Sequence, residues 1–315
     1  METAVKQKSS ERKRLDMIIY VKRTWQLYCM LLLPIAFFIV FRYVPMTNIV
    51  IAFQDYNMFR GVWDNQTWVG MRHFQEAFGS REFHLALRNT FLLNILDLIA
   101  GFPAPIILAI MLNELSFKTF KRVTQTVVYL PHFISWIIIA GLATRLFAPH
   151  NGIVNLALSS MGLERINFLM DNTWWVATYI TLGVWKDVGW GTIIYLAAIT
   201  GINPELYEAA EVDGANRLGK IWNVTLPGIR PTIVILLIMS IGRILGSEFD
   251  RPLNMQNFMV MDVGDVISTM VFRVGIRSFR FDYTAAIGLF QSVVCVIFLV
   301  AANQFAKKVG DRGVF

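Results

Sequence analysis

Residues 203–227 read NPELYEAAEVDGANRLGKIWNVTLP, a polar and helix-prone stretch between two long apolar segments. Asn203 followed by Pro204 is typical of a helix start, because Asn caps free backbone N–H groups and the fixed φ of Pro suits the first turn. Gly214 favours a left-handed stop to that helix. Apolar residues then recur at helical spacing, and Pro227 closes the segment. The sequence therefore predicts a compact knob of two short helices joined by a turn.

The rest of the chain is typical of an integral membrane protein. Of its 315 residues, 55% are hydrophobic and only 16% are charged, against roughly 25% in soluble domains. A helical span needs about 20 mostly apolar residues. Six segments meet this length, at about 25–45, 86–112, 124–147, 174–200, 230–250 and 283–306. The predicted fold class is an all-α membrane protein with six transmembrane helices, in which the knob occupies the loop at about 201–229.

Lysine placement predicts the orientation of these spans. Seven lysines and arginines crowd residues 1–24, and further lysines follow the second, fourth and sixth predicted spans. The loops at about 46–85, 148–173 and 251–282 contain no lysine. Because cytoplasmic loops are enriched in Lys and Arg, both termini and the knob are expected in the cytoplasm. We therefore predict a basic cytoplasmic segment, residues 1–24, followed by a single six-span domain, residues 25–315. This explanation of the +7 charge leaves no reason to expect a nucleic-acid partner.

The first predicted external loop, at about 46–85, is rich in aromatic residues. One interpretation is an aromatic belt at the membrane surface. The other is a folded external segment that packs on a partner.

The knob also resembles the EAA loop of permease subunits from binding-protein-dependent ABC importers. That pattern is Glu-Ala-Ala, three residues, Gly, nine residues, Ile, one residue, Leu-Pro. The matching residues here are Glu208, Ala209, Ala210, Gly214, Leu226 and Pro227, with Val224 at the Ile position. In addition, YLPHFISW at 129–136 resembles the third span of permeases for complex oligosaccharides, in the superfamily of the maltose permeases.

The resemblance implies the type I importer permease fold, a location in the bacterial plasma membrane and transport by alternating access. The expected partners are a second permease subunit, two ATPase subunits that bind ATP and Mg²⁺, and an extracytoplasmic solute-binding protein; this chain itself is expected to bind no cofactor. The knob would dock onto the ATPase, with Glu208 supplying a charge, Ala209 and Ala210 allowing close approach, and Gly214 setting the turn that follows Asp213. Leu226 and Pro227 would anchor the return to the fifth span.

Several polar residues fall inside or at the ends of predicted spans, where charges are costly and face a cavity or a partner. They are Asn94, Asp97, Trp185, Lys186, Asp187, Trp190, Arg243 and Glu248. Two interpretations stay open, namely ion pairs that lock the helices together and a wet central cavity that contacts a polar solute. Because Trp rings stack on sugars, the second interpretation predicts an oligosaccharide. Lys186 and Arg243 would suit an acidic one, unless neighbouring carboxylates neutralise them.

No catalytic or metal-binding constellation is expected. The four histidines lack metal-ligand spacing, and His132 after Pro131 is interpreted as a structural residue of a helix kink. A phosphate-loop fragment at 214–220 continues with Ile221 instead of Ser or Thr, so no nucleotide site is predicted. The alternative functions are a transporter driven by an ion gradient, which should show paired broken helices in two halves, and a membrane-embedded enzyme or assembly factor.

Overall fold

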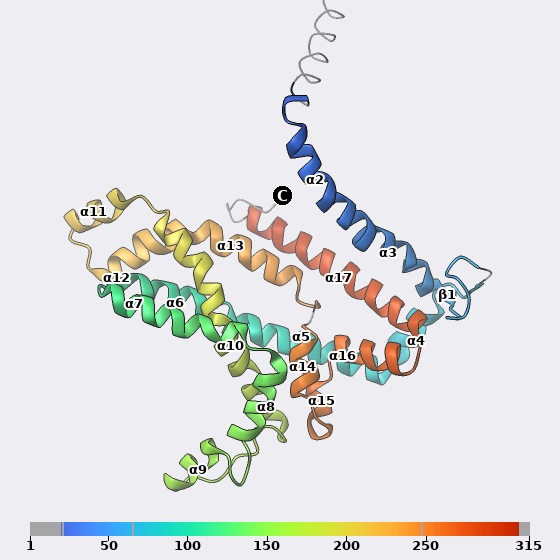
Figure 1. Ribbon diagram of the computed structural model, residues 1–315. Helices are drawn as coiled ribbons and strands as arrows, with labels where there is room; N and C mark the ends of the chain where they lie inside the picture. Colours follow the sequence, from blue (N-terminus) through green and yellow to red (C-terminus); the bar gives the residue numbers. More distant parts are fainter. Residues whose placement is uncertain (1–19, 21, 65, 247, 309–315) are drawn as a thin grey trace, which may run out of the picture. The chain divides into compact units, whose positions relative to one another are not determined.

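The computed structural model describes residues 20, 22–64, 66–246 and 248–308 (Figure 1). Most of the predicted basic segment, residues 1–19 and 21, lies outside the described residues. The chain divides after Gly70 into two compact units, which we describe separately.

Unit 1 begins with one long helical run. It consists of α2 (Trp25–Phe38), η1 (Ile39–Tyr43), α3 (Val44–Met46) and η2 (Thr47–Phe53). These 29 residues are apolar enough to cross a membrane, and none of the most apolar 18 is buried against the chain. Such a surface suits lipid. The first span is therefore confirmed as a candidate, and it reaches further than the predicted 25–45.

A short hairpin follows this run. β1 (Gln54–Asp55) pairs antiparallel with β2 (Thr67–Trp68), with Gln54 opposite Trp68. The Gln66 side chain braces the connection, because its amide nitrogen donates to the Asn57 carbonyl at 3.2 Å. This part of the predicted aromatic loop is therefore folded.

Unit 2 is built from helices of unequal length. They are α4 (Arg72–Gly79), α5 (Arg81–Gly101), α6 (Pro103–Glu114), α7 (Lys118–Tyr129), η3 (Leu130–Phe133), α8 (Trp136–Leu146), α9 (Ile153–Ser160), α10 (Asn172–Thr200), α11 (Pro204–Val212), α12 (Arg217–Lys220), η4 (Ile221–Thr225), α13 (Leu226–Gly242), α14 (Asp250–Met255), η5 (Phe258–Val260), α15 (Met261–Gly264), α16 (Ile267–Phe272), η6 (Arg273–Arg277) and α17 (Phe281–Lys308). Helix α10 packs along α5 and α6, and α13 packs along α17. Figure 1 shows α11 and α12 at one end of this unit and α4 and α16 at the other.

Four helical runs of the described residues are long and apolar enough to span a membrane, or five if a bent pair counts as one span. The six predicted spans are thus only partly recovered. The bent pair is the predicted third span, where Lys118–Phe133 and Trp136–Leu146 meet at 101° just after Pro131. The predicted fourth span forms the 29-residue helix α10. Helix α10 is not among the four apolar runs, because its Trp, Tyr, Thr and Gly residues and two charges lower its mean hydropathy.

One predicted boundary is wrong. The fifth span runs over Arg217–Gly242 and not 230–250, because the helix continues through Pro227 and ends before Arg243. Glu248 therefore lies beyond that helix. The predicted external loop 251–282 folds into short helices that enter the core, and Ile267 and Met270 on α16 are fully buried.

Candidate functional site

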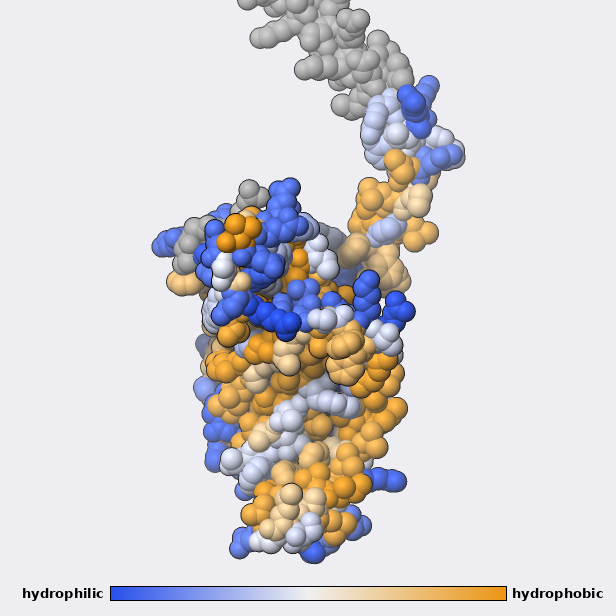
Figure 2. Space-filling model, turned by 90° about the vertical axis from the view of Figure 1, so that its left-hand side faces the viewer, coloured by the Kyte–Doolittle hydropathy of each residue, from blue (hydrophilic) through white to orange (hydrophobic). Residues whose placement is uncertain are grey.

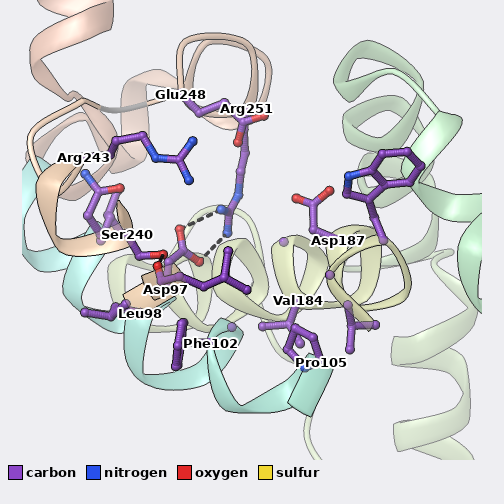
Figure 3. A pocket seen from close by; sticks show the side chains of 18 of the residues that line it. Asp97, Leu98, Phe102, Pro105, Val184, Asp187, Ser240, Arg243, Glu248 and Arg251 are labelled. Atoms are coloured by element: carbon purple, nitrogen blue, oxygen red, sulfur yellow. Dashed lines mark hydrogen bonds and ion pairs between the residues drawn. The ribbon is translucent and has the colours of Figure 1, made fainter. Parts of the chain in front are cut away.

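A cavity of about 780 Å³ lies among α5, α6, α10, α13 and the segment that leads into α14 (Figure 3). That volume is in the range of ligand pockets, roughly 300–1,000 Å³. Its polar lining residues include Asn94, Asp97, Asp187, Trp190, Ser240, Arg243, Glu248 and Arg251. Six of the eight residues predicted for a cavity therefore line it. Trp185 and Lys186 are not among the lining residues.

The centre of the cavity wall is an ion pair between Asp97 and Arg251. Arg251 donates from its two terminal nitrogens to the two carboxylate oxygens of Asp97, at 2.7 and 3.1 Å. Its guanidinium carbon lies 3.7 Å from the centre of the Tyr179 ring, a cation–π contact. Only 5% of Arg251 is exposed. The two-point geometry fixes both side chains and neutralises each charge.

Gly183 makes room for this guanidinium. A Cβ atom on Gly183 would lie 2.3 Å from one terminal nitrogen of Arg251. The absence of a side chain at this position of α10 therefore allows the arginine to reach Asp97. Arg251 is not among the residues predicted for a cavity, because it falls in a predicted external loop; its only sequence signal is an arginine directly before Pro252, close to a predicted span.

Lys186 is a buried cation with partners inside the protein. Its ammonium donates to the His132 carbonyl at 2.8 Å and lies 5.7 Å from the Trp136 ring centre. The lysine thus satisfies a carbonyl at the break between η3 and α8. Trp185 is 45% exposed.

His132 joins the broken third span to the cavity. Its Nδ1 lies 2.9 Å from an Asp187 carboxylate oxygen, and since a carboxylate only accepts, the ring N–H donates. The imidazole also stacks on the Trp190 ring, with centroids 4.6 Å apart and planes at 6°. His132 was predicted to be a kink residue; it also holds two cavity-lining residues in place.

Arg243 lies at the C-terminal end of α13, and Glu248 lies in the segment that follows it. The Trp136 indole N–H donates to Glu248 at 2.7 Å. Among the residues that the structure describes, no side-chain hydrogen bond or ion pair is found for Arg243. Figure 3 shows its guanidinium directed toward the Asp97–Arg251 pair. Among the described residues, the cavity lining thus includes three carboxylates, one arginine for which no side-chain partner is found, and the Trp190 ring, which is 48% exposed.

The second candidate site is the knob, residues 203–227. Asn203 caps α11 by accepting from the Glu205 backbone N–H at 3.1 Å. Gly214 has φ +79°, Gly214 N donates to Glu211 O and Ala215 N donates to Ala210 O. These two bonds are the Schellman motif, so the predicted left-handed stop is confirmed.

The knob leaves much of its surface uncovered. Glu208, Ala209, Asp213 and Pro227 are exposed, and Ala210 and Leu226 are half-buried. Val212 and Trp222 are 89% and 68% exposed. Viewed from the α11 end of unit 2, Figure 2 shows hydrophilic residues gathered around a few hydrophobic ones. Lys220 donates to Glu211 at 2.7 Å, and this hydrogen bond lowers the pKa of Glu211.

Fold and sites together define a helical membrane transport protein with a polar cavity and a protruding helical knob. The chain belongs to the family described as "Binding-protein-dependent transport system inner membrane component", which matches residues 101–311. It is the permease subunit of an ABC transporter, a multi-pass protein of the inner membrane, and it is not itself the catalytic subunit. The alternatives of an ion-driven transporter and of a membrane enzyme are thereby removed.

Individual relatives are similar over nearly the whole chain. The polygalacturonan/rhamnogalacturonan transport system permease protein YteP of Bacillus subtilis (strain 168) is 42% identical over 98% of this chain and 95% of its own length. Protein LplB of the same organism is 39% identical over 100% of both chains. A crystal structure of a bacterial alginate ABC transporter, in complex with an alginate pentasaccharide-bound periplasmic protein, contains a chain 41% identical with a TM-score of 0.85; 93% of this chain and 98% of that chain are covered.

Proposed function

We propose that this chain is one of two permease subunits in a bacterial importer that takes up an acidic oligosaccharide. YteP carries polygalacturonan in its name, and a second solved relative, 41% identical with a TM-score of 0.84, is described as importing the acidic polysaccharide alginate. Both polymers bear carboxylates. A solute of the same chemistry needs a cation in the translocation cavity.

The observation that carries the proposal is the difference between the two cavity arginines. Arg251 is already neutralised by Asp97 at 2.7 Å. Arg243 lines the same cavity, and no ion pair with another described residue satisfies it. A guanidinium binds a carboxylate through two parallel hydrogen bonds. Arg243 is therefore our candidate for the uronate contact, while Trp190 and Asp187 suit ring faces and hydroxyls.

The membrane topology of the proposal has six spans, with α10 as the span that hydropathy alone does not identify. Its 29 residues measure about 43 Å, longer than a hydrocarbon core of about 30 Å. Of its two charged residues, Asp187 lines the cavity and lies 2.9 Å from His132, and Lys186 is only 8% exposed. Such burial makes polar groups tolerable at membrane depth.

With six spans, both termini and the knob lie in the cytoplasm. The knob then contacts one of two ATPase subunits, which hold ATP and Mg²⁺, and the extracytoplasmic binding protein delivers solute to the opposite face. Exposed Glu208 and Val212 suit a docking surface of mixed polar and apolar character.

Transport by the reconstituted complex in proteoliposomes tests the solute. The ligands are an oligogalacturonate and its methyl ester, which has the same backbone without charge. We expect Arg243→Met to lower uptake of the free acid about tenfold, the factor that corresponds to about 1.4 kcal/mol, and to leave any uptake of the ester unchanged. Arg243→Lys is the matched control that keeps the charge. Equal loss for both ligands, or none, contradicts the assignment.

Lys186→Met separates binding from structure in the same assay. Because Lys186 bonds the His132 carbonyl and does not line the cavity, we expect less assembled complex instead of a selective loss of acid uptake.

A further inference from the structure

We propose that the hydrogen bond between Tyr207 and Thr225 is the contact through which α11 moves α13, so that both residues are positioning residues for coupling. This inference rests on the proposed function, in which the knob docks on an ATPase. It assigns to two residues outside the Glu-Ala-Ala pattern the transfer of that motion to the membrane.

The two halves of the knob are not mechanically equivalent. Arg217–Gly242 is one helical run of 26 residues, so α12 and η4 are the cytoplasmic extension of the span α13. Helix α11 is separated from this run by the turn at Gly214. Any displacement of α12 is carried directly into the membrane. A displacement of α11 needs a contact that reaches across the turn.

Among the described residues, two polar side-chain contacts are found between α11 and that run. One is the ion pair of Glu211 with Lys220 at 2.7 Å, in which the Glu211 side chain is 74% exposed. The other joins the Tyr207 hydroxyl to Thr225 Oγ1 at 3.0 Å, and Thr225 is 1% exposed. Exposed ion pairs are worth little and are screened by salt. The hydroxyl pair is part-buried and has the buried Thr225 as one partner, so it is the firmer link.

Thr225 occupies a special place in the helix. It ends η4, a π-helical turn in which Leu226 N donates to Ile221 O, five residues back. Thr225 Oγ1 itself lies 3.4 Å from the Lys220 carbonyl, also five residues back. Single π turns are rare and concentrate at functional sites. Tyr207 thus bonds to the run at its π-helical turn, two residues before Pro227.

Beyond this point the run packs against neighbouring helices on its way to the cavity, and Ile229 and Ile238 are its buried residues in α13. Ile229 is fully buried in a cluster with residues of α6 and α10. Leu236 and Ser240 of α13 line the cavity wall. A contiguous packed helix transmits displacement between separated sites. Pulling on Thr225 therefore moves the wall that contains Ser240.

The test compares Tyr207→Phe and Thr225→Val, each of which removes one hydroxyl and keeps the shape. The complex is reconstituted with its ATPase and binding protein, and three quantities are measured: subunit recovery, ATP hydrolysis rate, and solute imported per ATP. We expect recovery and hydrolysis to be retained and solute per ATP to fall about fivefold, the factor for one lost hydrogen bond. Thr225→Ser keeps the hydroxyl and should restore the ratio. Glu211→Gln, which removes the exposed link, should leave it unchanged.

Each contrary result has a distinct meaning. An unchanged ratio in both hydroxyl variants, an equal loss in Glu211→Gln, or loss of the complex in both overturns the coupling role. If the wild-type complex itself imports neither the acid nor its ester, the proposed function fails instead.

Discussion

The Asp97–Arg251 pair of the cavity and the acidic residues Glu208 and Asp213 of the knob show two opposite uses of charge. In the cavity, Asp97 pairs with Arg251 from 154 positions along the chain, and the pair is shielded from solvent. In the knob, the side-chain hydrogen bonds span 18 residues or fewer, and no side-chain hydrogen bond or ion pair with another described residue is found for Glu208 or Asp213. Charges that the chain neutralises itself hold the fold together. Charges that it leaves exposed are available to a partner.

The largest effect is expected for the cavity pair. Arg251→Met leaves Asp97 as a shielded carboxylate with no cation, which costs about 3–5 kcal/mol when a buried pair is broken. We expect a lower thermal midpoint and poor recovery of the purified complex.

Asp97→Asn combined with Arg251→Met removes both charges, so we expect much of the lost midpoint to return. A double variant no more stable than Arg251→Met would show that the guanidinium acts through Tyr179 instead of Asp97.

A smaller effect is expected for Gly183→Ala, which adds only one methyl group. Its Cβ would lie 2.3 Å from the Arg251 guanidinium, so the arginine must shift away from Asp97. Overpacking of this kind costs about 1–3 kcal/mol. Gly141→Ala in α8 is the matched control, because a Cβ there meets no atom within 4 Å. Equal midpoints for the two variants would contradict the role of Gly183.

The same comparison explains what the sequence could predict. The cap at Asn203 and the stop at Gly214 depend on residues close in sequence, so their local pattern predicted them. Arg251 could not be found in that way, because its partner Asp97 lies in a different span. The space for its guanidinium exists only because Gly183, in a third helix, has no side chain. Helix α10 was predicted correctly as a helix, but its mean hydropathy is low because polar residues dilute the apolar ones. The packing of α5 and α6 along it depends on residues far away in the sequence. The roles of the predicted site residues in docking and solute binding stay predictions.

In the knob, Gly214→Ala should cost about 1 kcal/mol. Open space surrounds a Cβ at this position, so the cost comes only from the φ of +79° that L residues disfavour. We expect a small decrease in the thermal midpoint and lower recovery of the ATPase. Glu208→Ala is the control, with a midpoint within about 0.5 kcal/mol of wild type but weaker ATPase binding. Gly214→Ala with an unchanged midpoint would contradict the strain argument.

The smallest effect concerns an ion pair at the opposite end of unit 2 from the knob. Arg280 donates to both carboxylate oxygens of Glu76, at 2.9 and 2.8 Å, and this hydrogen bond lowers the pKa of Glu76. Because the folded-state pKa is depressed, the stability that the pair contributes is fully present above the unfolded pKa of about 4.3 and is lost as pH falls through the lower folded value. The side chains of Glu76 and Arg280 are 44% and 40% exposed. The ion pair should therefore contribute less than about 1 kcal/mol to the free energy of unfolding. We therefore expect Glu76→Gln to lower the thermal midpoint slightly at pH 7, and the gap from wild type to narrow as the pH falls below the unfolded pKa of about 4.3. Thermal midpoints of the two proteins at pH 7 and at pH 3.5 measure this gap. A gap that widens on acidification would mean that Glu76 is stabilised in its neutral form, and that the pair with Arg280 does not hold this end of the unit.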